Sequence, residues 1–110
     1  MKEKNGVQGT YRFEVRNASL INGTLFLNSE SNYRDPKCLT VRCGETATRM
    51  LAIKFGQSPE LFLRGKFILV SGRPVRTPIA LLENGEPTNL GYHQTHIRVG
   101  NPEQISLTNQ

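Results

Sequence analysis

Alternating hydrophobic and polar residues mark the start of the chain as a series of short strands. Residues 11–15 alternate hydrophobic with charged side chains, which is the period-two pattern of a strand with one buried face. The dipeptide Asn22-Gly23 separates that run from the hydrophobic run 24–27. Asn-Gly between two such runs is a strong signal for a tight hairpin. The sequence therefore predicts two strands joined by a short turn.

The period of the pattern then changes from two to 3.6. Residues 39–43 still alternate and predict a third strand, with Thr40 and Arg42 on the face opposite its hydrophobic residues. After residue 44, one stripe of a helix collects four hydrophobic side chains, namely Ala47, Met50, Leu51 and Phe55. Gly56 stands where glycine commonly ends a helix. We therefore expect one principal helix over residues 44–56.

Two further strands and an extra hairpin are expected in the second half of the chain. Residues 67–73 predict a fourth strand, and a fifth strand begins after Tyr92 and is bent by Gly100 and Pro102. The segment 77–91 between them is long for a loop in a compact domain, which favours a functional role for it. Its centre has the composition of a hairpin tip.

The order strand–strand–strand–helix–strand–strand resembles the OB-fold. The resemblance rests on the phrases 23–28, 65–72 and 101–105, and it covers residues 9–108. The chain is similar to small single-domain bacterial OB-fold proteins of the nucleic-acid-binding type. We therefore expect an all-β fold with one helix, a five-stranded antiparallel OB-fold barrel whose helix lies between the third and fourth strands.

Length and composition indicate one domain. A chain of 110 residues with 36% hydrophobic content has enough material for one modest core. We expect residues 1–8 to be a flexible lead-in and residues 9–108 to form the domain. No hydrophobic run approaches the roughly 20 residues that span a bilayer. Cys38 and Cys43 stand at the two ends of one predicted strand, too far apart for a disulfide. A reduced, cytoplasmic protein without membrane contact is the expectation.

The charge balance favours a polyanionic partner. Fourteen Lys and Arg residues against nine Asp and Glu residues give a net charge of +5, and nine of the fourteen are arginine. Arginine is suited to bidentate phosphate contacts and to stacking on bases.

The resemblance to the OB-fold also implies where a ligand would bind. OB-folds bind on the face of strands 2 and 3, flanked by the loops between strands 1 and 2 and between strands 4 and 5. Single-stranded nucleic acid needs cations for its phosphates and flat side chains for its bases. The residues that meet those needs are Tyr33, Arg34, Lys37, Arg42, Arg73, Arg76, Tyr92 and Phe26. Two assignments stay open: Phe26 either stacks on a base or belongs to the core, and Tyr33 either binds or packs over the barrel mouth.

No catalytic or metal site is expected. Asp35 is the only aspartate, so a cluster of carboxylates for a divalent ion cannot be assembled convincingly. His93 and His96 stand three residues apart on a predicted strand, which sends them to opposite faces. The sequence identifies no base beside either cysteine. We expect no cofactor and no enzymatic activity.

Two functions of different classes fit these observations. In the first, the protein binds single-stranded DNA or RNA without chemistry. In the second, the 77–91 hairpin mediates contact with a protein partner or with a second copy of the chain. The run Ile79–Leu82 favours the second, because four consecutive hydrophobic residues on an exposed arm need a cover.

Overall fold

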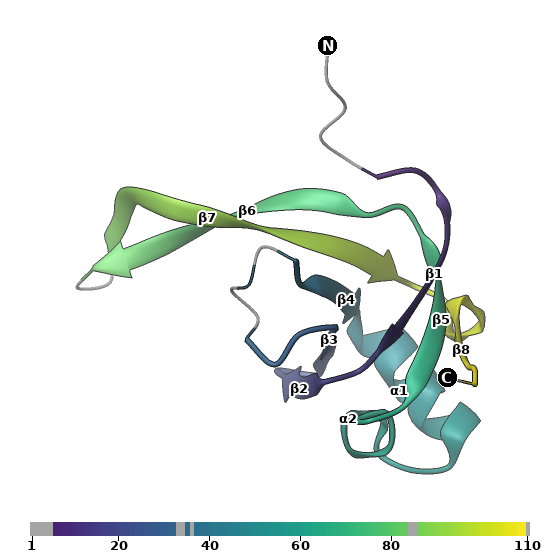
Figure 1. Cartoon of the computed structure of the whole chain (residues 1–110). Helices are drawn as coiled ribbons and strands as arrows, with labels where there is room; N and C mark the ends of the chain where they lie inside the picture. Colours follow the sequence, from purple (N-terminus) through teal and green to yellow (C-terminus); the bar gives the residue numbers. More distant parts are fainter. Residues whose placement is uncertain (1–5, 33–34, 36, 84–85, 110) are drawn as a thin grey trace.

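The protein is mostly β structure with one principal helix, as predicted (Figure 1). The computed structural model describes residues 6–32, 35, 37–83 and 86–109, and for residues 78–83 and 86–92 it describes the backbone only. In chain order the elements are β1 (Gly9–Glu14), β2 (Asn17–Ile21), β3 (Thr24–Asn28), β4 (Leu39–Cys43), α1 (Glu45–Phe55), α2 (Pro59–Phe62), β5 (Phe67–Gly72), β6 (Val75–Glu83), β7 (Glu86–Val99), the 3-10 helix η1 (Pro102–Gln104) and β8 (Ile105–Leu107).

The strands form two sheets. One has the order β1-β5-β8, and the other has the order β2-β3-β4-β7-β6. Paired neighbours run antiparallel except β4 and β7, which run parallel. The prediction of an entirely antiparallel set of strands is therefore wrong. The reason lies in the path of the chain: β6 runs opposite to β4, and β7 turns back from β6, so β7 takes the direction of β4.

The first predicted strand is divided between the two sheets at Val15 and Arg16. The backbone N–H of Val15 donates to the carbonyl of Lys66 at 2.8 Å, whereas the N–H of Arg16 donates to the carbonyl of Asn28 at 2.9 Å. Over two residues the chain thus leaves β1, which pairs with β5, and enters β2, which pairs with β3. The residues before the Asn22-Gly23 turn, which were expected to form a single strand, therefore belong to both sheets.

The fourth predicted strand corresponds to β5, which ends at Gly72, and Arg73 and Pro74 separate it from β6 in the other sheet. Gly72, the last residue of β5, lies against Ile97 of β7: a Cβ atom at Gly72 would be 2.5 Å from Ile97 Cγ2. The two sheets approach closely at this point, and only a residue without a side chain fits there.

Two short-range signals of the sequence are confirmed, and a proline begins the short second helix. Asn22 and Gly23 join β2 to β3 with φ angles of 51° and 82°, the positive pair that a type I′ turn requires. Gly56 ends α1 in the left-handed conformation, with φ 72°. Pro59 begins α2 at the first helical position. The bounds of α1 lie within one residue of the predicted range at each end.

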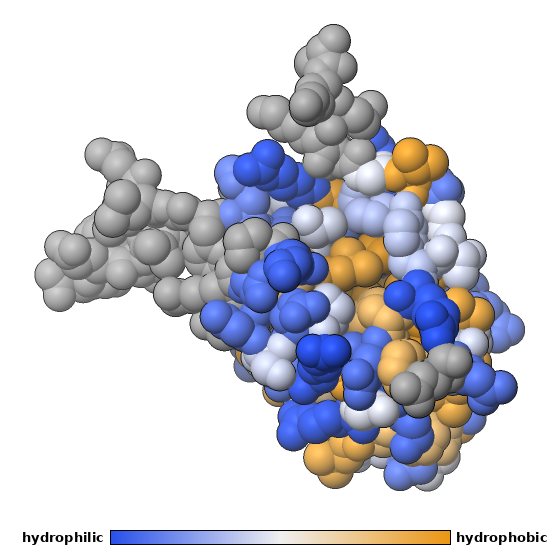
Figure 2. Space-filling model, in the orientation of Figure 1, coloured by the Kyte–Doolittle hydropathy of each residue, from blue (hydrophilic) through white to orange (hydrophobic). Residues whose placement is uncertain are grey.

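The hydrophobic core lies between the sheets and α1. Its buried members come from both sheets and from the helix, and they include Val15, Leu25, Leu27, Val41, Leu51, Leu63, Ile68, Val70, Ile97 and Ile105. The helix buries Ala47, Thr48 and Leu51, whereas Met50, which the predicted stripe included, is 45% exposed. Figure 2 shows hydrophobic surface in the lower part of the view, where Figure 1 places α1 and α2.

The extra hairpin expected between residues 77 and 91 is present as the paired strands β6 and β7. Their register runs from Val75 opposite His96 to Glu83 opposite Glu86, with an irregularity between Ala80 and Leu82. The hairpin extends well away from the rest of the molecule (Figure 1). β7 therefore begins before Tyr92, earlier than predicted. The side chains of Ile79–Leu82 lie outside the described residues.

The C-terminal segment crosses from one sheet to the other. After β7, Asn101 caps η1, and its side chain accepts a hydrogen bond from the N–H of Glu103 at 2.8 Å. The chain then enters β8, which pairs with β5. The predicted bend at Gly100 and Pro102 is thus the point where the fifth run changes sheets. Among the described residues, no helix is long and hydrophobic enough to cross a membrane.

Candidate functional site

The outer face of the five-stranded sheet carries the residues from which a site can be built. Alternation along β3 sends Leu25 and Leu27 into the core, where both are fully buried, and turns Phe26 to the opposite face. Phe26 is half-buried and lies outside the hydrophobic core cluster. The sequence left open whether Phe26 belongs to the core or faces outward, and in the structure it lies on the outer face.

Two rows of side chains cross this face, because paired residues of neighbouring strands stand side by side. The register from β2 to β7 gives a first row of Ser19, Phe26, Arg42 and Arg98. The adjacent row contains Asn17, Asn28, Thr40 and His96. The parallel pairing of β4 with β7 is what places the two arginines next to each other.

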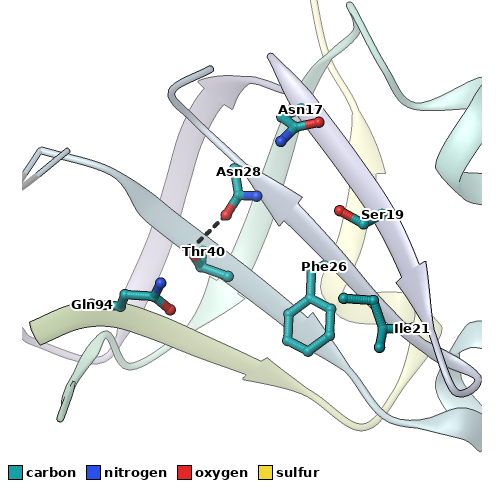
Figure 3. Close-up of a pocket in the computed structure, with 7 residues that line it drawn as sticks. All are labelled: Asn17, Ser19, Ile21, Phe26, Asn28, Thr40 and Gln94. Carbon is teal, nitrogen blue, oxygen red and sulfur yellow. Dashed lines mark hydrogen bonds between the residues drawn. The ribbon is translucent and has the colours of Figure 1, made fainter. Parts of the chain in front are cut away.

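A groove of about 380 Å³ opens on this face (Figure 3). It is lined from four neighbouring strands by Asn17, Ser19, Ile21, Phe26, Asn28, Thr40 and Gln94. The lining combines amide and hydroxyl groups with one aromatic ring and one aliphatic side chain, and it contains no carboxylate. Phe26 belongs both to the groove and to the row that ends in the arginines, so it connects the two.

Hydrogen bonds fix the floor of the groove. The hydroxyl of Thr40 donates to the side-chain oxygen of Asn28 at 2.6 Å, and the thiol of Cys38 lies 3.8 Å from that same oxygen. The ring of His96 bonds through Nε2 to the side-chain oxygen of Gln94 at 2.7 Å. These side chains are therefore held in place by the protein itself.

Positive charge is concentrated at one end of the rows. Arg42 and Arg98 are both exposed, and the one ion pair within the described residues joins Arg16 to Glu14, elsewhere in the molecule. Burial lowers the pKa of His96 below its ordinary value, and the charges of Arg42 and Arg98 lower it further. Arg42 and Arg98 are partners in the register of β4 with β7, and neither has a carboxylate partner in the described part of the chain, so this end of the face offers positive charge to an anion.

The structure brings some of the residues predicted from the sequence together and keeps others apart. Phe26 and Arg42 are direct cross-strand neighbours. Lys37 is exposed shortly before β4, and its backbone N–H donates to Asp35 at 2.9 Å. Arg73 is exposed between β5 and β6, and its Nε donates to the carbonyl of Gly6 at 3.1 Å, near the start of the described chain.

The remaining predicted residues are placed away from this face or not described. Arg76 Nη2 lies 3.3 Å from His93 Nδ1, and the register of β6 with β7 puts this pair on the opposite face of the sheet from Arg42. Tyr33 and Arg34 lie outside the described residues, as does the side chain of Tyr92.

Sequence reasoning missed several residues of this face. Arg98 alternates with Ile97 and Val99, which are buried, so the alternation alone was sufficient to turn Arg98 outward. Asn17 and Gln94 carried no local signal, because their place in the groove depends on which strands become neighbours. That information is in the pairing of the strands and not in any one run.

The described residues were also compared with what a metal site or a nucleophilic cysteine requires. His93 and His96 do lie on opposite faces, and no group of three His, Cys, Asp or Glu side chains in the described ranges can hold a metal ion. Cys38 and Cys43 are both free and buried. Burial raises the pKa of the Cys43 thiol to about 12, so at neutral pH it is not the thiolate that nucleophilic catalysis requires.

The arrangement offers groups suited to a ligand that is part flat and part anionic. A half-buried phenyl ring offers a stacking surface, the two arginines offer charge, and the groove offers hydrogen-bonding groups. A scan against protein-family models and searches of curated proteins and of solved structures found no match to this chain.

Proposed function

We propose that the protein binds single-stranded nucleic acid on the outer face of its five-stranded sheet, without chemical conversion of the ligand. The observation that carries the proposal is the row in which Phe26, Arg42 and Arg98 stand next to one another across three strands. In this row the ring would stack on a base while the guanidinium groups meet the phosphates.

The energetics of the arginine pair support a phosphate ligand. Like charges directly opposite on a sheet are destabilising, so Arg42 and Arg98 cost the free protein some stability. A phosphate between them converts that repulsion into charge-assisted hydrogen bonds, which are about twice as strong as neutral ones. The net charge of +5 adds a longer-range attraction for any polyanion.

The flat component of the site supports a strand with accessible bases. Base–aromatic stacking needs a ring whose face is open, and it contributes about 1–3 kcal/mol per base. In a duplex both faces of a base are already stacked on its neighbours. We therefore infer a preference for single strands over duplex of the same sequence.

The proposal also concerns the fold: we infer that the two sheets are parts of one OB-type barrel. β1 and β2 would be a single bent strand, as would β5 and β6, so that the order β2-β3-β4-β7-β6 returns through β5 and β1 to β2. Five strands in a ring cannot all alternate in direction, because the number is odd. One parallel pair is therefore required, and the pair β4–β7 supplies it. On this interpretation β3 and β4 are strands 2 and 3, whose face is the usual OB binding surface.

A second candidate function is contact with a protein partner or with a second copy of the chain. It is favoured by β6, which stands at the edge of its sheet and extends along the projecting hairpin (Figure 1). An edge strand offers unpaired backbone groups to another chain. The hydrophobic run Ile79–Leu82 belongs to this strand.

Replacing the stacking ring tests the nucleic-acid proposal. Phe26→Leu should weaken binding of a fluorescent single-stranded oligonucleotide by about 1 kcal/mol or more, because leucine fills similar space but offers no π-face. Fluorescence anisotropy with single-stranded DNA, RNA and duplex measures the change. Phe67→Leu, the same change on a half-buried residue of β5 in the other sheet, should bind as wild type does. Equal affinity of the Phe26 variant and wild type would show that the Phe26 ring does not take part in binding.

A further inference from the structure

The groove beside Phe26 contains hydrogen-bonding groups that the fold leaves uncommitted. Asn28 and Gln94 are engaged with Thr40 and His96. In contrast, the amide of Asn17 and the hydroxyl of Ser19 make no hydrogen bond within the described part of the chain, and both side chains line the groove (Figure 3). They stand on β2, on the same face as Phe26.

The size of the groove fits more than solvent. A single water occupies about 30 Å³ of liquid volume, so about 380 Å³ leaves room for a ring system with its substituents. Volumes of roughly 300–1,000 Å³ are usual for small-molecule sites, which combine hydrophobic walls with a few placed polar groups. Phe26 and Ile21 are the hydrophobic part of this lining, and Asn17 and Ser19 are polar groups on its β2 side.

We propose that this groove reads the edge of one nucleobase, with the amide of Asn17 and the hydroxyl of Ser19 hydrogen-bonding to the base that stacks on Phe26. The inference rests on the proposed function and deepens it, because it makes binding depend on the base and not only on backbone and stacking. An amide presents a donor and an acceptor side by side, and base edges present the matching pair. The arginines of the adjacent row, Arg42 and Arg98, supply the charge that keeps a phosphodiester strand over the groove.

Edge reading also adds a second reason for choosing single strands. In a duplex the Watson–Crick edges are covered by the opposite strand, so Asn17 and Ser19 would have no free partner there. In a single strand the same edges are open, and an unstacked base can turn into the groove.

A nucleobase isostere separates edge reading from stacking. In an oligothymidylate of about ten residues, a length within the site size of one such domain, thymine is replaced throughout by 2,4-difluorotoluene. The isostere keeps the shape and the flat face of the base but hydrogen-bonds poorly. Anisotropy is measured with both strands on wild type, on Asn17→Ala, and on the control Thr24→Ala, which changes a residue of β3 outside the groove lining.

Wild type and Thr24→Ala should bind the thymine strand about five-fold or more tightly than the isostere strand, the lower end of what one bidentate base contact contributes. Asn17→Ala should lose most of that difference while it retains the affinity for the isostere. Equal binding of the two strands by wild type would overturn edge reading and leave the stacking proposal standing. An unchanged difference in Asn17→Ala would overturn the role of Asn17. No binding of any strand by wild type would overturn both proposals.

Discussion

At the scale of single residues, His96 links the candidate site to pH. Its pKa in the folded protein lies below the ordinary value of 6.5, because the ring is buried and because Arg42 and Arg98 stand near it. The unfolded chain therefore binds a proton more readily than the folded protein as the pH falls through that value. Protonation of the unfolded state then draws the equilibrium toward unfolding, so this residue makes the protein less stable in acid.

His96→Gln should reduce this acid sensitivity. The wild-type free energy of unfolding, measured with urea, should fall between about pH 8 and about pH 5.5, and the variant should lose less over the same interval because its side chain takes up no proton. His93→Gln is the matched control, since His93 is exposed and lies on the opposite face. Identical pH profiles for wild type and His96→Gln would contradict the assignment.

At the scale of elements, the close approach of β5 and β7 depends on Gly72. An added methyl group would meet Ile97 at 2.5 Å, inside the core. Gly72→Ala should therefore destabilise the protein by about 1–3 kcal/mol, the usual cost of overpacking. Gly100→Ala is the matched control: an added Cβ there meets nothing within 4 Å. Chemical denaturation measures both. Equal stability of the two variants would show that the sheets can move apart here at little cost, and that Gly72 is not required for their close approach.

The β6–β7 hairpin allows a separate test of the second candidate function. Deletion of residues 79–89 removes the projecting part of the hairpin, while the pairing of β4 with β7 begins beyond it, at Thr95. If the hairpin mediates self-association, the deletion should leave a folded protein of smaller size in solution. Circular dichroism checks the fold and light scattering checks the size. A wild type and a deletion variant that are both monomeric, with no partner lost, would count against this function.

The elements themselves could largely be predicted from the sequence, because their signals are local. Alternation placed Thr40 and Arg42 on the face opposite the buried Val41 and Cys43, and Gly56 marked the end of the helix. The change of sheet between Val15 and Arg16 was not predicted: the alternation shifts there from the odd positions up to Val15 to the even positions Ala18 and Leu20, but this local irregularity does not say which strands become partners. Hydrogen-bond partners from distant parts of the chain divide these residues between the two sheets. The errors in the predicted fold therefore come from strand pairing between distant parts of the chain, which the local pattern does not contain.

The candidate site likewise has residues that a local pattern predicts and residues that only the strand pairing brings together. Arg42 was identified because it alternates with core residues of its own strand, whereas the sequence left the position of Phe26 open and the structure turns it to the outer face. Arg98 was missed as a member of the site, since only the parallel register of β7 with β4 places it beside Arg42. Arg76 was assigned to the site from its charge, although its position in β6 turns it to the other face. A site made by neighbouring strands is read from the register and not from composition.

At the scale of the whole molecule, the proposed function requires a single strand to lie across the face that carries Arg42 and Arg98. Each phosphate neutralised on a single strand contributes about 0.7 to the slope of log affinity against log salt. These two arginines and Lys37, exposed before β4, would give about three contacts and a slope near −2 in total. A stacking residue changes affinity without changing this slope, so the slope reports on the cations alone.

The most direct measurement is therefore the salt dependence of single-strand binding by fluorescence anisotropy. We expect a slope near −2 for wild type and about −0.7 for the double variant Arg42→Ala/Arg98→Ala, which removes two of the three contacts. Arg49→Ala, which removes the same charge from an exposed position on α1, should keep the wild-type slope. Absence of binding to every single strand at low salt would contradict the proposed function, and a double variant with the wild-type slope would contradict phosphate binding by the two arginines.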